Sequence, residues 1–175
     1  MFSDPRKNVE QFDLAPGMKV ADFGCGAGYY AFAMAYKIGS SGQVFALDVH
    51  KELLLTLKRE AIKTRLHNIE VVWCDLERPK GTKLRDGAVE RGVAADVLFQ
   101  IGHKEAFVHE IARVMKVGGK ILVIDWTDSF GGIGPKKDVV VSAEKCRELF
   151  ESAGFGFERE IDAGMHHYGL IFRKI

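Results

Sequence analysis

Short apolar segments rich in β-branched residues alternate along the chain with longer segments of helical periodicity. Such alternation is typical of βαβ units that stack into a mostly parallel sheet with helices on both faces. The segment Lys120–Asp125 is nearly continuous in apolar residues, as expected for a central strand buried on both sides. Only Asp162–Met165 separates the last two expected strands, so these must pair antiparallel. The sequence therefore predicts an α/β, Rossmann-like, doubly wound seven-stranded sheet, mostly parallel with an antiparallel C-terminal hairpin.

Apolar runs, glycine and proline punctuation and helix caps place the individual elements. The expected strands are 18–23, 43–48, 69–74, 94–100, 120–125, 156–161 and 166–173. The expected helices are 29–38, a segment after 48 that buries Leu53, Leu54, Leu57 and Ile62, a helix over 105–116, and one capped by Ser142. The polar segment 77–92 predicts a loop, and Gly118 and Gly119 are expected to end the helix before the fifth strand.

Composition narrows the class of protein. A chain of 175 residues with 47% hydrophobic residues can bury one core, so residues 1–175 are expected to form a single domain. The 25 basic and 24 acidic residues nearly cancel, which disfavours a nucleic-acid partner. The three cysteines show no metal-ligand spacing and predict free thiols and no metal site. No segment has the length to cross a bilayer, so we expect a cytoplasmic monomer or homodimer that does not bind a membrane.

A glycine-rich turn, Asp22–Gly28, joins the first expected strand to the first expected helix. Its three glycines, Gly24, Gly26 and Gly28, let a ligand lie against backbone amides at a helix N-terminus. The dinucleotide fingerprint requires its third glycine one residue later, where Tyr29 stands. The carboxylate of Asp22 would repel a pyrophosphate and attract an ammonium group. The turn therefore indicates a ligand with a positive charge.

Two further carboxylates stand at the ends of expected strands. Asp48 ends the second strand, about twenty residues beyond the glycines, where a carboxylate can bind ribose hydroxyls. Asp75 ends the third strand. The carboxyl ends of neighbouring parallel strands line one crevice, so Asp22, Asp48 and Asp75 should converge there. Three carboxylates favour a sulfonium amino acid over NAD.

These motifs resemble those of the class I S-adenosylmethionine-dependent methyltransferases, in order and over residues 20–174. Val20–Gly28 resembles the first motif, Leu47-Asp48 the second, Cys74-Asp75-Leu76 the third and Asp96-Val97-Leu98-Phe99 the fourth. Arg113–Gly119 is similar to the Arg-Val-Leu-Lys-Pro-Gly-Gly signature and differs from it at Met115 and Val117. The resemblance is closest to small relatives of the ubiquinone and menaquinone C-methyltransferases.

The resemblance implies S-adenosyl-L-methionine as cofactor, a methyltransferase activity and a small-molecule acceptor. By the same resemblance Gly24, Gly26 and Gly28 pass against the methionine moiety, Asp22 lies near its amino group and Asp48 binds the ribose. Asp75 would meet the adenine amine, with Val49 and Leu76 flanking the ring. Cys25 in the first motif and Phe99 in the fourth complete the expected cofactor-binding set.

Several side chains are candidates for the acceptor side. His103, in the loop after the fourth strand, is the candidate base, the alternative being an exposed residue at a helix start. His166, His167 and Tyr168 are expected near the rim, because the sixth strand should run parallel to the others. The loop containing Trp126, Phe130, Gly131 and Ile133 could form a mobile apolar cover or an inert surface loop.

Two alternatives to methyl transfer remain open from the sequence. One is an NAD-linked Rossmann oxidoreductase. The other is a non-catalytic domain that binds S-adenosylmethionine, because the resemblance leaves few residues for a separate acceptor site.

Overall fold

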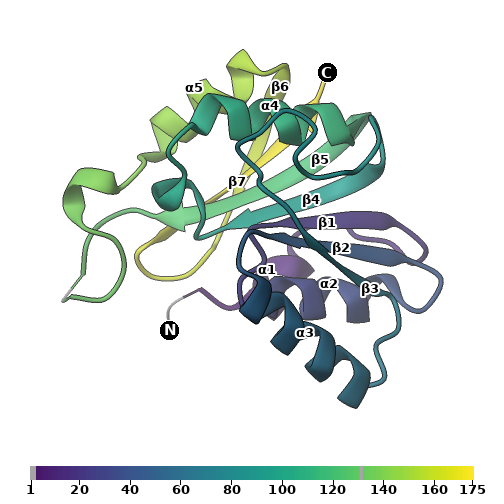
Figure 1. The fold of residues 1–175 in the computed structure, drawn as a ribbon. Coiled ribbons are helices and arrows are strands. Elements are labelled where there is room, and N and C mark those ends of the chain that lie inside the picture. The colour runs from purple at the N-terminus through teal and green to yellow at the C-terminus, as the bar shows by residue number, and fades with distance from the viewer. Residues whose placement is uncertain (1–2, 131) are drawn as a thin grey trace.

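The computed structural model describes residues 3–130 and 132–175. Within them one sheet contains seven strands: β1 Lys19–Phe23, β2 Gln43–Asp48, β3 Ile69–Trp73, β4 Val89–Ala95, β5 Met115–Trp126, β6 Phe155–Ile161 and β7 His167–Lys174. Their order is β3-β2-β1-β4-β5-β7-β6 (Figure 1). The pairs from β3 to β5 are parallel, and β7 is antiparallel to both β5 and β6. The predicted fold class is confirmed.

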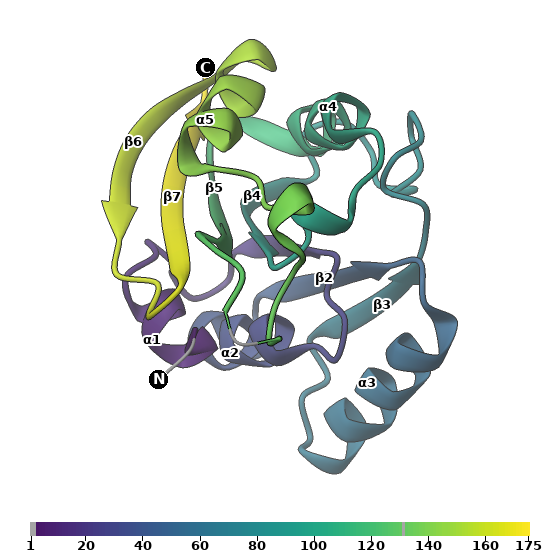
Figure 2. The same ribbon diagram turned by 90° about the vertical axis from the view of Figure 1, so that its left-hand side faces the viewer.

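Helices cover both faces of this sheet. They are α1 Pro5–Glu10, α2 Tyr29–Ile38, α3 Lys51–Lys63, α4 Lys104–Val114 and α5 Ala143–Ser152, with short 3₁₀ helices η1 Leu98–Gln100 and η2 Lys137–Val139. The first three helices lie on one face and α4 and α5 on the other, as Figures 1 and 2 show. Each face buries its own apolar cluster. None of the helices in these residues is long and apolar enough to cross a bilayer.

Local signals located several elements correctly. The bounds of α2 and β2 are those predicted: Gly28 and Gly39 cap α2, and a turn that contains Gly42 precedes β2. Ser142 caps α5, accepting a hydrogen bond from the Lys145 N–H at 3.2 Å. The segment between β3 and β4 contains no helix. The helix α1 is an addition to the expected elements, and its cap is Asp4, which accepts from the Arg6 and Lys7 amides.

The fourth strand was predicted too late in the chain. It covers Val89–Ala95 rather than 94–100, because Arg91–Val93 pair with β1 and Arg91–Ala95 pair with β5. The polar Glu90 is tolerated at the start of the strand, since its carboxylate accepts the Lys19 N–H at 2.9 Å. Asp96 then leaves the sheet in a left-handed conformation, with φ 55°. Of the fourth-motif residues, Asp96 and Val97 therefore follow the strand, and Leu98 and Phe99 are the first residues of η1.

Two other helix predictions need correction. Helix α4 ends at Val114, and Gly118 and Gly119 belong to β5 rather than to a helix end. In α3 the buried apolar residues are Leu54, Leu57 and Ala61, whereas Leu53 and Ile62 are 39% and 61% exposed. The prediction included too many buried residues, because the sheet covers only a narrow side of α3.

Candidate functional site

A cavity of about 440 Å³ opens at the carboxyl ends of the parallel strands, where the order of strands in the sheet changes direction between β1 and β4. Loops after four strands and the start of α3 form its wall, which consists of Gly24, Gly26, Asp48, Val49, His50, Leu53, Asp75, Leu76, Glu77, Val97, Gln100 and Ile101. Such a switch point is where open α/β sheets bind ligands. The structure thus brings together six of the ten residues predicted to bind the cofactor.

Asp48 ties the glycine loop to the end of β2. Its carboxylate accepts the Gly26 N–H and the His50 N–H, each at 2.8 Å, and lies 2.9 Å from the His50 ring Nδ1. A carboxylate offers about four acceptor positions, so these contacts occupy most of them. His50 is the contact that can give way to a ribose hydroxyl, because its side chain is 66% exposed.

The glycine loop leaves bare backbone along the cavity. A Cβ built on Gly26 would meet no atom within 4 Å, so open space lies against the main chain there. A Cβ on Gly24 would instead lie 2.6 Å from the Val97 side chain. Gly24 thus permits the close approach between the loop and the segment after β4, and Gly26 leaves room for a ligand.

Asp22 lies behind the wall of the cavity. The residue is 2% exposed, and its Oδ2 atom is buried without a hydrogen-bond partner among the described residues. Burial raises the pKa of Asp22 to about 7; the Ala31 amide of α2 opposes the rise, and the nearby Asp48 adds to it. An unpaired buried carboxylate is costly, and a ligand cation would supply the missing partner.

Asp75 is at the end of the cavity near β3. Its side chain is 44% exposed, accepts the Glu77 N–H at 3.0 Å and pairs with the Arg78 Nε at 3.0 Å. The apolar wall beside it includes Val49, which is 54% exposed, and Leu76, which is buried. A polar acceptor flanked by apolar side chains suits a planar heterocycle with an amino group.

The remaining predicted residues do not line this cavity. Cys25 is buried in the cluster beneath α2. Gly28 caps α2, and a Cβ there would lie 2.4 Å from Leu57 Cδ1, so this glycine serves helix packing. Phe99 lies in η1. His103 is the exposed N-cap of α4, and its N–H donates to Glu77 Oε2 at 2.6 Å. Functional roles for these four residues remain predictions.

Sequence reasoning missed several wall residues. Glu77 could have been found, because it comes two residues after a strand-end carboxylate on the same loop. Val97 and Gln100 could not, because the predicted fourth strand, 94–100, covers them, and Ile101 directly follows that predicted strand. Their exposure to the cavity depends on the strand ending at Ala95.

The β6–β7 turn reaches the same edge of the sheet, as predicted, since β6 is parallel to β5. His167 Nε2 lies 3.1 Å from Asp96 Oδ1, and its ring centroid lies 4.3 Å from that of Trp126. His166 instead pairs with Asp128 at 2.8 Å and stacks on Phe130 at 4.1 Å. Phe130 also pairs with Ile133 in an isolated antiparallel bridge, while Gly131 of the same loop is outside the described residues. The two histidines therefore serve different contacts.

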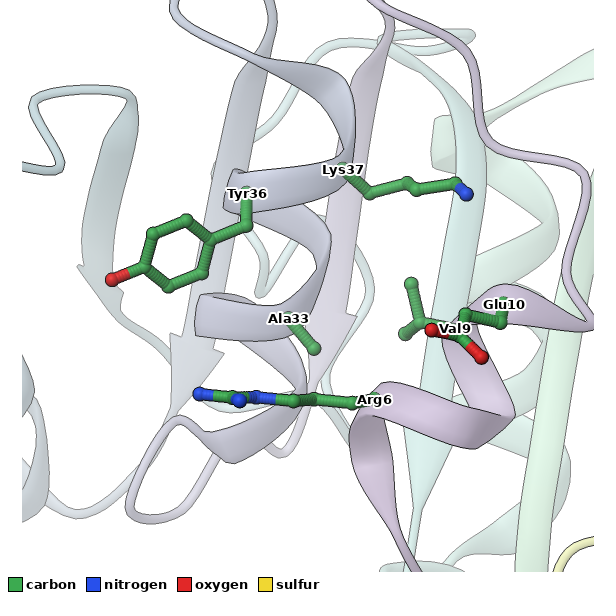
Figure 3. A pocket seen from close by; sticks show the side chains of 6 residues that line it. All are labelled: Arg6, Val9, Glu10, Ala33, Tyr36 and Lys37. Atoms are coloured by element: carbon green, nitrogen blue, oxygen red, sulfur yellow. The ribbon is translucent and has the colours of Figure 1, made fainter.

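A second cavity, of about 420 Å³, lies between α1 and α2 (Figure 3). Arg6 extends from α1 toward α2, and Tyr36 and Lys37 project from α2. Its lining includes none of the residues predicted to bind the cofactor.

No group of three or more potential metal ligands occurs in the described part of the chain, and all three cysteines are free and buried there.

Comparisons with known proteins agree with this geometry. The family model described as "Methyltransferase domain" matches residues 14–154. The ubiquinone/menaquinone biosynthesis C-methyltransferase UbiE of Cupriavidus metallidurans is 31% identical over 119 residues, which are 68% of this chain and 47% of that protein. The chain thus spans about half the length of the curated relatives it matches.

Solved structures show the same fold over nearly the full chain. A SAM dependent methyltransferase from Aquifex aeolicus has a TM-score of 0.90 and 28% identity, covering 99% of this chain and 91% of that chain. The cyclase SpnF has a TM-score of 0.82 at 18% identity, covering 97% of this chain and 80% of that one, and shows the fold alone. With its family match, its relatives and its fold, the chain belongs to the methyltransferase domain family, among the class I S-adenosylmethionine-dependent methyltransferases.

Proposed function

We propose that the chain transfers the methyl group of S-adenosylmethionine to a small-molecule acceptor. The observation that carries the proposal is the buried carboxylate of Asp22, of which Oδ2 has no hydrogen-bond partner among the described residues, beside a cavity that Asp48 and Asp75 line. A ligand that combines a cationic amino acid with a nucleoside matches both ends of this arrangement. The bare backbone at Gly26 fits the same ligand, because no side chain obstructs it.

Different residues of the cavity would bind different parts of the cofactor. Asp22 would pair with its ammonium group, Asp48 with its ribose and Asp75 with its adenine amine. Val49 and Leu76 would flank the adenine ring on the apolar wall. When bound, the cofactor supplies an activated methyl group on a positively charged sulfur. The protein's task is then to align the acceptor with that group and to exclude water.

The two alternatives are less well supported. An NAD-linked oxidoreductase would place a pyrophosphate near the carboxylate of Asp22, which would repel it. A non-catalytic domain that binds the cofactor would share the whole cavity. The fold does not separate these functions, since a protein named a cyclase has it too. Methyl transfer must therefore be measured directly.

The relatives' names indicate the kind of acceptor. UbiE is named for C-methylation in quinone biosynthesis, and we propose a small organic acceptor for this chain rather than a nucleic acid. The near balance of 25 basic and 24 acidic residues supports this choice, because polyanion binders carry an excess of positive charge. The three free thiols support a cytoplasmic location, because thiols stay reduced in the cytosol.

Two measurements test the proposal. Calorimetry should show S-adenosylmethionine binding that weakens by roughly 1–3 kcal/mol in Asp48→Ala, the usual cost of losing charge-assisted hydrogen bonds. Incubation with methyl-labelled S-adenosylmethionine and a small-molecule cell extract should yield a labelled product. Binding without transfer would indicate the non-catalytic alternative, and thermal stabilisation by NADH alone would indicate the oxidoreductase.

A further inference from the structure

A second set of titratable side chains lies beside the cofactor cavity, at the carboxyl ends of β4 and β5 and the amino end of β7. Asp96 follows β4, Asp125 is near the end of β5 and His167 begins β7. Asp96 directly precedes Val97, which lines the cavity. Its carbonyl accepts the side-chain amide of Gln100, another cavity residue, at 2.8 Å. Asp96 therefore stands next to the wall on the side away from the predicted adenine site.

The hydrogen bonds of His167 define its protonation chemistry. Its Nδ1 lies 2.9 Å from the Met165 carbonyl, and a carbonyl only accepts, so Nδ1 carries a hydrogen. Its Nε2 lies 3.1 Å from Asp96 Oδ1. On a neutral ring this nitrogen would direct a lone pair at the carboxylate. A proton on Nε2 converts that repulsion into an ion pair, so the contact favours the imidazolium.

The side chains of His167 and Asp96 differ in solvent exposure. The His167 side chain is 2% exposed, and its Nε2 is buried without a well-aligned hydrogen-bond partner among the described residues. The Asp96 side chain is 41% exposed. Asp96 Oδ1, the oxygen nearest the histidine, is buried as well, so the exposed part of the Asp96 side chain is not the part that contacts His167. Asp96 also has φ 55°, in the left-handed region that aspartate adopts more readily than most residues other than glycine, and such residues are concentrated at functional sites.

The neighbouring charged groups support the ion pair. Burial lowers the pKa of His167, but Asp96, the Met165 carbonyl and Asp125 outweigh it and raise that pKa above the usual 6.5. Asp125 accepts the Leu98 and Trp126 amides, each at 2.8 Å, so backbone donors hold it in place. Tyr168, next to His167, is buried, and its pKa is raised mainly by burial, so the phenol stays neutral.

We propose that Asp96 is a catalytic residue that receives the proton released by the acceptor, and that His167 is a positioning residue that holds its carboxylate. This inference rests on the proposed function and deepens it, because it names the acceptor class. The acceptor carries an O–H or N–H proton on its nucleophilic atom or conjugated with it. As that atom bonds to the methyl carbon, the carbon–sulfur bond breaks and its electron pair stays on sulfur. The acceptor's proton passes to Asp96 and from its exposed side to water.

Three variants of the full chain test this assignment. Asp96→Asn keeps the shape and tolerates the left-handed conformation. His167→Asn retains a donor for the Met165 carbonyl and removes Nε2. His109→Asn, on the exposed side of α4, is the matched control. Calorimetry with S-adenosylmethionine should give the same affinity for all, within about twofold. Label transfer to the small-molecule extract should be roughly 100-fold slower in Asp96→Asn at pH 7.

The pH dependence separates a catalytic role from a structural one. The loss in Asp96→Asn should shrink toward pH 10, because the acceptor then ionises without help. His167→Asn should lose roughly tenfold and shift the acid limb of the pH–rate profile, because the cation beside the carboxylate is gone. In NMR titrations, Asp96→Asn should lower the pKa of His167, since burial is then less opposed.

The outcomes distinguish failure of this inference from failure of the proposed function. If wild type transfers label and Asp96→Asn retains its rate within threefold at pH 7, the inference is wrong and the proposed function stands. An equal loss at every pH, or an unchanged His167 titration, also overturns it. If wild type binds the cofactor and transfers no label, the proposed function itself fails.

Discussion

At the scale of single residues, Asp22 lowers the stability of the ligand-free protein and is expected to favour ligand binding. A buried carboxylate without a full set of partners destabilises the folded protein, and a bound cation would relieve that cost. In the sequence, its position just before the glycines indicated that Asp22 takes part in ligand binding. Its burial and its unpartnered oxygen come from the packing of α2 against β1.

Replacing this carboxylate by the isosteric amide tests both effects. Asp22→Asn should stabilise the ligand-free protein above pH 7 by about 1–2 kcal/mol, or roughly 2–8 °C in Tm, because no buried charge remains. It should weaken S-adenosylmethionine binding by at least about tenfold. Thermal melts and calorimetry measure both, with Glu148→Gln on the exposed side of α5 as control. A lower Tm with unchanged affinity would contradict the assignment.

Two glycines of the same loop should separate binding from folding. Gly26 has φ 49° and open space at its Cβ position, so Gly26→Ala should cost only about 1–2 kcal/mol of stability and yet weaken cofactor binding. Gly28→Ala meets Leu57 at 2.4 Å and should cost roughly 2–4 kcal/mol. Urea unfolding and calorimetry check the pair. Equal stability losses would show that the loop adjusts around Leu57.

At the scale of elements, α4 holds the long loop between β3 and β4 through one buried carboxylate. Glu110 is 3% exposed and accepts the Lys80 N–H at 2.9 Å and the Thr82 N–H at 3.1 Å. It also pairs with Arg113 at 2.7 Å. This loop begins with Asp75 and Glu77, so its order supports the cavity wall.

Removing that carboxylate should loosen the loop. Burial alone would raise the pKa of Glu110, but Arg113 and the Thr82 donors lower it, so the group is ionised and fully bonded at neutral pH. Glu110→Ala should cost about 3–5 kcal/mol, because buried donors and a guanidinium lose their partner. Urea unfolding measures the loss, and Glu105→Ala, exposed on the same helix, is the control. Comparable stability of the two variants would refute the anchoring role.

At the scale of the whole molecule, three groups make stability depend on pH in the same direction. The pKa is raised to about 7 in Asp22 and to about 6 in Asp125, mainly by burial, and it is also raised in His167 despite burial. In each case the folded chain binds its proton more tightly than the unfolded chain. Their stability contribution is therefore greatest at low pH and is lost as pH rises through these folded values.

The ligand-free protein should accordingly melt at a higher temperature at pH 5 than at pH 8. Below about pH 4.5 the trend reverses, because Asp13, Glu90, Glu110 and Glu158 have lowered pKa values and lose their pairing when protonated. Scanning calorimetry at constant ionic strength checks this. Saturating S-adenosylmethionine should flatten the slope above pH 5, because the cation favours ionised Asp22. A melting temperature that rises from pH 5 to pH 8 would disprove the account.

Local patterns were sufficient for the outline of fold and site. Apolar runs and glycine turns located β1, β2, β3 and α2, and therefore the strand ends where Asp48 and Asp75 stand. Parallel strands present their carboxyl ends together, so two carboxylates on one cavity could be foreseen. The placement of β4 could not, because Glu90 and Arg91 are strand residues only through their pairing with β1 and β5.

The sequence by itself determined the α/β class, the glycine loop and the acidic strand ends, because each depends on residues close together in the chain. Tertiary structure alone decided that Asp22 Oδ2 is buried without a partner among the described residues, that Gly28 packs on Leu57 and that Asp96 meets His167. Those contacts join distant segments. They depend on which strands and helices become neighbours in the fold, and the periodicity of a single segment does not encode that.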